Sequence, residues 1–134
     1  MVMRGRWTIA GAALAVLLAA TIGAATENVT MTFCRQVAGR EPVGEAVSFS
    51  ADVGWIYCHI TLDNPQAPTQ IHHDWYYQGA YISRHTLAVG TGRRWRTFSA
   101  KKVGPAWVGA WEVVVRDADE RELARKSFTV TPAP

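Results

Sequence analysis

Apolar and polar residues alternate in short runs along most of this chain, and turn-forming residues separate the runs. A period of two places successive side chains on opposite faces of an extended strand, whereas an amphipathic helix needs a period near 3.6 residues. The chain shows no convincing amphipathic helix. The pattern predicts seven β-strands, over residues 29–34, 54–62, 70–78, 80–89, 93–99, 110–116 and 123–130.

The connections between these runs are rich in turn residues. Glycine and proline interrupt residues 39–45 (GREPVGE) and 100–109 (AKKVGPAWVG), so both are predicted as loops, and residues 117–120 (DADE) as a hairpin turn. Strands spaced by roughly ten residues are typical of a sandwich of immunoglobulin size. The sequence therefore predicts an all-β, immunoglobulin-like two-sheet β-sandwich of about seven strands, as a single domain over residues 26–134.

The first 25 residues have a different pattern. Arg4 and Arg6 precede an uncharged stretch rich in alanine and leucine, which ends in the small residues Gly23 and Ala25. This order is typical of a secretory signal helix cleaved after Ala25. The apolar segment 7–25 is also about long enough to remain as a membrane anchor. Both interpretations predict an exported protein, periplasmic or extracellular, and the second adds membrane association.

The charge balance bears on the class of partner. The chain has 14 Lys and Arg against 11 Asp and Glu, a formal net charge of +3. Removal of residues 1–25 takes away two arginines and no acidic residue, which leaves a net charge near +1. A nearly neutral domain does not support nucleic-acid binding, so we predict no nucleic-acid partner, although the domain can still carry local basic patches.

The chain has two cysteines, Cys34 and Cys58. In an oxidising compartment an isolated pair usually forms a disulfide, so we expect a Cys34–Cys58 bond. It would close a loop of about two dozen residues and stabilise the fold by roughly 3 kcal/mol. The alternative is a pair of buried free thiols. No CxxC motif indicates a redox role.

Several segments carry a family resemblance. They are RQVAGREPVGE, WIYCHITL, HHDWYYQG, RRWRTFSAKK and GAWEVVVRDADERELARKSF, and together they span roughly residues 29–130. The most specific pieces are Arg40-Glu41-Pro42, His73 with Trp75, Trp95-Arg96 with Ser99 and Lys101, and Gly109 with Trp111. In these segments the chain resembles the bacterial family of domains of unknown function numbered 2914 (DUF2914).

One departure from the family pattern lies in the last hairpin, where Glu120 or Arg121 stands in place of a usual glycine. The resemblance implies a small all-β, immunoglobulin-like domain that is exported or tethered to a membrane. It implies no known activity and no catalytic residues.

Signatures of catalysis are lacking in the sequence. The serines are scattered and none lies in a GxSxG elbow. A metal site would have to be built from His59, one of His72 and His73, and His85. Adjacent residues of a strand point to opposite faces, so no spacing enforces such a site. We therefore predict a non-enzymatic domain without a metal or cofactor.

A basic stretch provides the predicted interaction surface. Arg94 and Arg96 share one strand face, Lys101 and Lys102 extend it, and Trp107 adds an aromatic contact. Such a patch suits an anionic ligand, an acidic partner or lipid headgroups. The alternative is a solvated edge strand whose charges discourage aggregation.

The aromatic residues divide between core and surface. The tryptophans expected in the core from the alternation are Trp75, Trp95 and Trp111. Trp55, Tyr57 and Tyr76 fall on the other strand faces and form a candidate aromatic face.

The functional prediction follows from these surfaces. We expect a non-enzymatic exported β-sandwich module that mediates protein or cell-envelope interactions, with a partner that the sequence does not name. The alternative is a carbohydrate- or small-ligand-binding domain that uses the exposed aromatic face.

Overall fold

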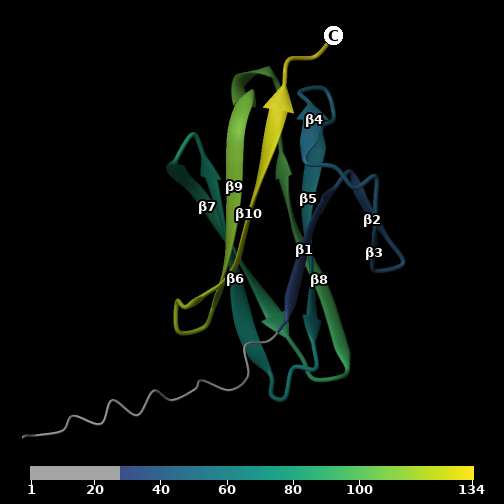
Figure 1. The fold of residues 1–134 in the computed structure, drawn as a ribbon, viewed down its shortest axis with the longest axis vertical. Coiled ribbons are helices and arrows are strands. Elements are labelled where there is room, and N and C mark those ends of the chain that lie inside the picture. Colours follow the sequence, from purple (N-terminus) through teal and green to yellow (C-terminus); the bar gives the residue numbers. More distant parts are fainter. Residues whose placement is uncertain (1–27) are drawn as a thin grey trace, which may run out of the picture.

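The computed structural model describes residues 28–134, which form β-strands and one short 3-10 turn, η1 (Pro105–Trp107). Two sheets pack around a shared core, consistent with a β-sandwich (Figure 1). The three-stranded sheet has the order β1 (Val29–Cys34), β5 (Trp55–Asp63), β8 (Arg94–Lys102). The five-stranded sheet has the order β4 (Ser48–Ser50), β10 (Glu122–Thr131), β9 (Gly109–Asp117), β6 (Thr69–Tyr77), β7 (Ala80–Val89).

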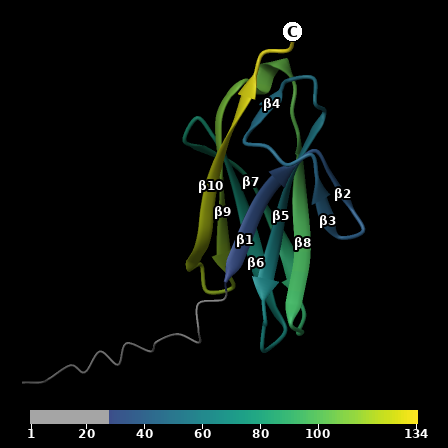
Figure 2. The same ribbon diagram turned by 45° about the vertical axis from the view of Figure 1, so that its right-hand side comes forward.

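A third, two-stranded sheet lies beside the three-stranded one (Figure 2). It is the hairpin of β2 (Gln36–Ala38) and β3 (Glu41–Val43). Gly39 and Arg40 form its two-residue turn, and both have positive φ, at 55° and 65°. Two consecutive positive φ angles are the geometry of a type I′ turn, which suits the twist of a tight hairpin.

The long strands cross repeatedly between the two main sheets. β5 is followed by β6 in the other sheet, and β8 lies between β7 and β9 in sequence but in the opposite sheet. All pairings are antiparallel except that of β4, which runs parallel to the last residues of β10. The first part of the chain thus contributes β1 to one sheet and β4 to the other.

The core is built from alternate residues of both sheets. Phe33 from the three-stranded sheet meets Phe128 from the five-stranded sheet with ring centroids 4.7 Å apart. The Trp111 ring stacks on Phe128 at 5.8 Å, and Trp75 meets both edge-on. These four side chains are 0–2% exposed, so one aromatic cluster joins the sheets.

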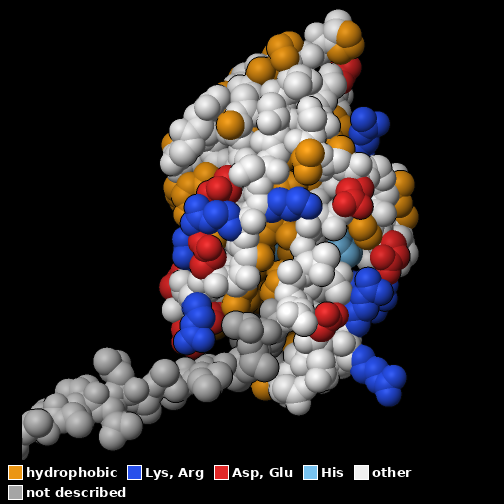
Figure 3. All heavy atoms as spheres, in the orientation of Figure 1, with side chains coloured by type: hydrophobic (Ala, Val, Ile, Leu, Met, Phe, Trp, Pro, Cys, Tyr) orange, Lys and Arg blue, Asp and Glu red, His pale blue; other side chains and the backbone are white. Residues whose placement is uncertain are grey.

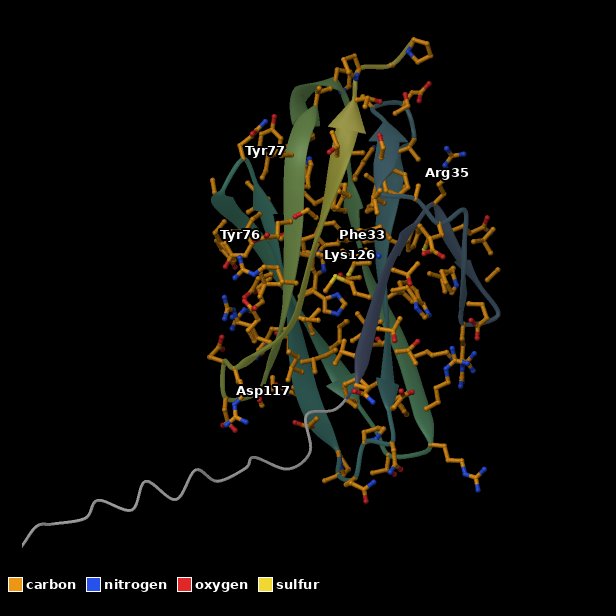
Figure 4. The ribbon with its side chains drawn as sticks, viewed as in Figure 1. Phe33, Arg35, Tyr76, Tyr77, Asp117 and Lys126 are labelled. Carbon is orange, nitrogen blue, oxygen red and sulfur yellow. The ribbon has the colours of Figure 1, made fainter. Side chains whose placement is uncertain are left out.

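A lysine closes the side of the sandwich where β1 and β10 approach each other. The ammonium group of Lys126 donates a hydrogen bond to the carbonyl of Met31 at 3.1 Å. It also lies 5.9 Å from the centroid of the Phe33 ring, and Figure 4 shows the two side chains close together between β1 and β10. An edge carbonyl of β1 is therefore satisfied across the sheet boundary.

The seven predicted strands are all present, with ends that differ by up to three residues. The strands β2, β3 and β4 were not predicted, and the predicted loop 39–45 contains β3. Three residues are too short a run to show a period of two, so the prediction was wrong there.

The predicted N-terminal helix lies outside the described residues. Within residues 28–134, the structure contains no helix long and apolar enough to span a membrane.

Candidate interaction site

The outward side of β5 and β8 carries most of the predicted surface residues, and we call it the β5–β8 outer face. It comprises Trp55, Tyr57, Arg94, Arg96, Phe98 and Lys102, which the strand register places on one side of the sheet. Trp55 is 48% exposed and Phe98 is 44% exposed, which is high for large apolar side chains. The Tyr57 and Phe98 rings lie 5.7 Å apart, so the three aromatic residues form a row across the two strands.

Basic residues stand at both ends of this row. Lys102 is opposite Trp55 in the register, and Arg94 is opposite Asp63 at the other end of β8. Within residues 28–134, neither Arg94 nor Lys102 forms an ion pair, and both are exposed. Arg96 instead forms an ion pair with Glu41 of the hairpin. Two cations therefore remain available for a partner.

The β2–β3 hairpin covers the middle of the same sheet face. Its turn carbonyl, from Arg40, accepts a hydrogen bond from His59 Nε2 at 2.8 Å, and His59 is only 3% exposed. The ion pair between Glu41 and Arg96 fixes the hairpin from its other strand. The hairpin thus borders the aromatic row, as seen beside β5 and β8 in Figure 2.

Two of the predicted surface residues lie elsewhere. Lys101 is opposite Ile56 and points to the inner side of the sheet, because alternation separates it from Lys102. Its ammonium group sits 5.2 Å from the centroid of the Trp107 ring. Trp107 is itself half-buried and packs against Tyr77 and Trp111. The expected surface of five residues therefore comes together only in Arg94, Arg96 and Lys102.

The predicted aromatic face also divides. Trp55 and Tyr57 belong to the β5–β8 outer face, but Tyr76 lies on the outer side of the five-stranded sheet, opposite Glu112 and beside Tyr81 (Figure 4). Phe98 was not proposed from the sequence, although the period of two already placed it with Arg94. The pairing of β5 with β8, which no local pattern specifies, brings it next to Tyr57.

The predicted disulfide is not formed in this structure. Cys34 and Cys58 are free and buried. In the register Cys58 is opposite Phe33, while Cys34 is opposite Tyr57, so adjacent positions send the two side chains to opposite faces of the sheet. Cys58 belongs to the core cluster, and burial raises the pKa of its thiol, which keeps it protonated.

A network of charges occupies the outer side of the five-stranded sheet. The side chain of Asp74 is 3% exposed and accepts hydrogen bonds from Arg84 at 2.7 and 2.9 Å and from Arg116 at 3.2 Å. Arg84 also donates two bonds of 2.6 Å to Glu120. The hydrogen bonds from Arg84 lower the pKa of Asp74 below its ordinary value. Figure 3 shows acidic and basic side chains interspersed on this side, consistent with internal pairing.

Between the sheets lies a buried polar group. His73 is fully buried, and its Nδ1 is 2.6 Å from Ser99 Oγ, which also accepts a bond from Trp75 Nε1 at 3.2 Å. The Ser99 hydroxyl can accept from both side chains, and His73 Nε2 has no hydrogen-bond partner within residues 28–134. Desolvation, with a smaller contribution from His85, lowers the pKa of His73 to about 3.

The histidines do not converge on a metal. His59 lies under the hairpin, His72 lies on the outer side of the five-stranded sheet, and His73 is opposite His85 inside. In the described part of the chain, no three side chains of His, Cys, Asp or Glu are grouped to hold an ion.

Two shallow hollows border the sheets. One of about 390 Å³ adjoins the β5–β8 outer face at Lys102 and follows the loop from Val103 to Trp107. The other, of about 510 Å³, lies on the five-stranded sheet between Tyr76 and Arg125.

Comparison with known proteins confirms the family resemblance. Residues 68–130 match the family model described as protein of unknown function (DUF2914), a stretch that begins just before β6 and ends in β10. No curated protein matches the chain. Among solved structures, a superoxide reductase (neelaredoxin) from Ignicoccus hospitalis matches with a TM-score of 0.45 and 13% identity, covering 78% of this chain and 80% of its own. A likeness at that level carries no information on activity.

Proposed function

We propose that this protein is a non-enzymatic, exported β-sandwich module that binds another protein or a cell-envelope component through the β5–β8 outer face. The observation that carries the proposal is the aromatic row, in which Trp55 and Phe98 are exposed and Tyr57 is half-buried, with unpaired cations at its ends. Aromatic side chains are enriched where proteins bind each other, and neighbouring charges give orientation and speed to the encounter.

We further infer that the sandwich is immunoglobulin-like. Two features of the topology support this class. The first part of the chain supplies β1 to one sheet and β4 to the other, and the chain crosses between the sheets from β5 to β6. Trp75 of β6 is buried in the core near the strand that carries Cys58, as a core tryptophan is in such domains. Immunoglobulin-like folds host many unrelated functions, so the proposed function rests on the β5–β8 outer face and not on the fold.

Export is the remaining part of the proposal. Its support is the order of residues 1–25, with Arg4 and Arg6 before an apolar stretch and small residues at its end. Mass spectrometry of the protein from its own cells tests it, because cleavage leaves a chain that begins at Thr26. An intact N-terminus in a membrane fraction supports anchoring, and an intact chain in the cytosol contradicts export.

Crosslinking in the native envelope, followed by mass spectrometry, tests the interaction. We expect crosslinks from Lys102 to a single main partner. The double substitution Arg94→Glu with Lys102→Glu should abolish capture of that partner by affinity purification, with an unchanged circular dichroism spectrum. The charge-matched control is Arg121→Glu with Arg125→Glu, on the other sheet, which should leave capture intact. Equal capture by both variants contradicts the proposal.

A second function is favoured by one observation. Trp55 presents about half of its surface beside Tyr57, and exposed aromatic rings of this kind also stack on sugar rings. Binding on a glycan array that disappears in Trp55→Ala would establish a carbohydrate-binding module. Tyr81→Ala is the control, since Tyr81 is 59% exposed on the other sheet. A blank array removes this alternative.

A further inference from the structure

β8 is the edge strand of the three-stranded sheet, with β5 as its only neighbour among the described strands. It is nine residues long and contains neither a proline nor a recorded bulge. Every second backbone N–H and C=O group of such a strand points away from the sheet, so β8 offers a row of hydrogen-bonding groups to an incoming chain.

The inner side of β8 faces β6 and β7 of the other sheet. Ser99 of β8 bonds His73 and Trp75 of β6, and part of β8 also lies close to β7. Ile71, His73 and Trp75 of β6 are buried, whereas most inner side chains along β7 and β8 are half-buried. The half-buried side chains are Ser83, His85, Leu87, Trp95, Thr97 and Lys101.

Two buried polar atoms in this region also lack partners. Ser83 Oγ and Trp95 Nε1 form no hydrogen bond within residues 28–134. An added strand beside β8 would cover half-buried side chains at this edge and bring polar groups close to them.

The charges along β8 indicate which kind of partner strand can pair with it. If two copies paired through β8 in antiparallel fashion about Phe98, Arg94 would stand opposite Lys102 of the other copy. Like charges directly opposite each other destabilise a sheet, so the edge disfavours self-association and favours an acidic strand. Lys126 satisfies an edge carbonyl of β1 by bonding Met31. Within residues 28–134, no side chain forms such a bond to the backbone of β8.

We propose that β8 accepts an extended acidic segment of a partner protein as the fourth strand of its sheet. This deepens the proposed function and rests on it, because it names the partner's chemistry and binding mode. Backbone hydrogen bonds supply affinity in such strand addition, and alternate side chains supply specificity.

The register of the outer face gives a recognition pattern. Residues of the partner opposite Arg94 and Lys102 are acidic, and the residue opposite Phe98 is apolar. These three positions are spaced by four residues along β8, so the pattern is an acidic residue, three others, an apolar residue, three others and a second acidic residue. It reads the same in both directions and does not depend on the orientation of the added strand.

The probe is a nine-residue peptide with glutamate at positions 1 and 9, leucine at position 5 and threonine elsewhere. It is added to the natively processed protein while amide hydrogen exchange is followed by NMR. We expect exchange of alternate amides of β8 to slow at least about tenfold at saturation, with no change in β1 or β7.

Two controls separate strand addition from charge attraction. The same peptide with alternate backbone amides methylated keeps its charge but loses several donors, so its affinity should fall at least about tenfold. The variant Arg94→Glu with Lys102→Glu should lose the original peptide and bind a peptide with lysine at positions 1 and 9.

The results that would contradict strand addition differ from those that would contradict the proposed function. Absence of peptide binding, unchanged exchange in β8, equal binding of the methylated peptide, or protection caused by dimerisation each overturns strand addition. Crosslinks from Lys102 to a native partner without protection of β8 would leave the interaction module standing and refute this mode alone.

Discussion

Asp74 is a carboxylate that the fold takes out of water and pairs with two arginines, Arg84 and Arg116. We expect Asp74→Ala to lower the free energy of unfolding at pH 7 by about 2 kcal/mol, since it removes charged hydrogen bonds from a buried site. Urea denaturation measures the change. The control is Asp52→Ala, an exposed aspartate in the connection between β4 and β5, which should cost less than about 0.5 kcal/mol.

The difference in stability between the native protein and Asp74→Ala should also depend on pH. The pKa of Asp74 is lower in the folded protein than in the unfolded chain, so its stabilisation is fully present above the unfolded value of about 3.9. It is lost as the pH falls through the lower folded pKa. The gap in stability between the native protein and Asp74→Ala should therefore narrow below pH 4. A gap that stays constant to pH 2 would show that packing, not charge, holds the site.

His73 also lowers the stability of the protein as the pH falls, but it does so at higher pH than Asp74. Its folded pKa of about 3 lies below the unfolded value of about 6.5, so between these limits only the unfolded chain takes up the proton. Stability should fall with decreasing pH by up to about 1.4 kcal/mol per unit from this group alone. His73→Asn keeps an acceptor near Ser99 and removes the titration. From pH 6.5 to pH 5 it should lose about 2 kcal/mol less than the native protein.

The matched control is His72→Asn, one residue away on the outer side of the same strand. The nearby groups His85 and Lys101 are unchanged in both variants, so their contributions cancel in the comparison. If His73→Asn and His72→Asn gave the same slope of stability against pH, His73 would not be the buried neutral group inferred here.

At the scale of the element, we expect the β2–β3 hairpin, which covers Cys34, to open separately from the core. Gly39 has a φ of 55°, which a β-branched residue adopts only at a cost of about 1–2 kcal/mol. Gly39→Val should speed labelling of Cys34 by a thiol reagent by about tenfold, and leave Cys58 unlabelled. Peptide mapping by mass spectrometry follows both sites. Ala38→Val, in the strand before the turn, is the control and should leave the rate unchanged.

A different result would revise the account of the cysteines. If neither cysteine reacted until a reductant was added, the two would be joined in the exported protein, and β1 would have to shift against β5 from the register seen here. The sequence alone predicted that bond because spacing and compartment are local information. The opposite orientation of the two side chains depends on the strand pairing.

The elements that the sequence predicted well share one property. Each of the seven long strands has enough residues to show its period, and all but β1 end near glycine, proline or an acidic turn. The site was harder to predict. Alternation along β8 already separated Lys101 from Lys102, but no local pattern showed that β5 would lie next to β8, or that Tyr76 would belong to the other sheet. The ion network of Asp74 depends in the same way on three strands meeting.

At the scale of the whole molecule, the aromatic cluster makes the two sheets one cooperative unit. Phe128 contacts Phe33 across the core and Trp111 and Trp75 within its own sheet. Phe128→Ala should lower the free energy of unfolding by about 3–5 kcal/mol, because it removes a fully buried ring and leaves a cavity. Thr129→Ala, the next residue, is exposed on the outer side of β10 and should cost less than about 0.5 kcal/mol.

Cooperativity itself is measured by comparing probes in urea denaturation. Tryptophan fluorescence reports on both sheets, through Trp75 and Trp111 of the five-stranded sheet and Trp55 and Trp95 of the three-stranded sheet, whereas labelling of Cys58 reports on the three-stranded sheet alone. Because Phe128 and Phe33 join the sheets, both probes should give the same midpoint in the native protein, and both should shift together in Phe128→Ala. Exposure of Cys58 well before the fluorescence change would show that the three-stranded sheet unfolds alone. The edge strand β8 would then belong to a sheet that unfolds on its own, whereas strand addition needs a stably folded sheet.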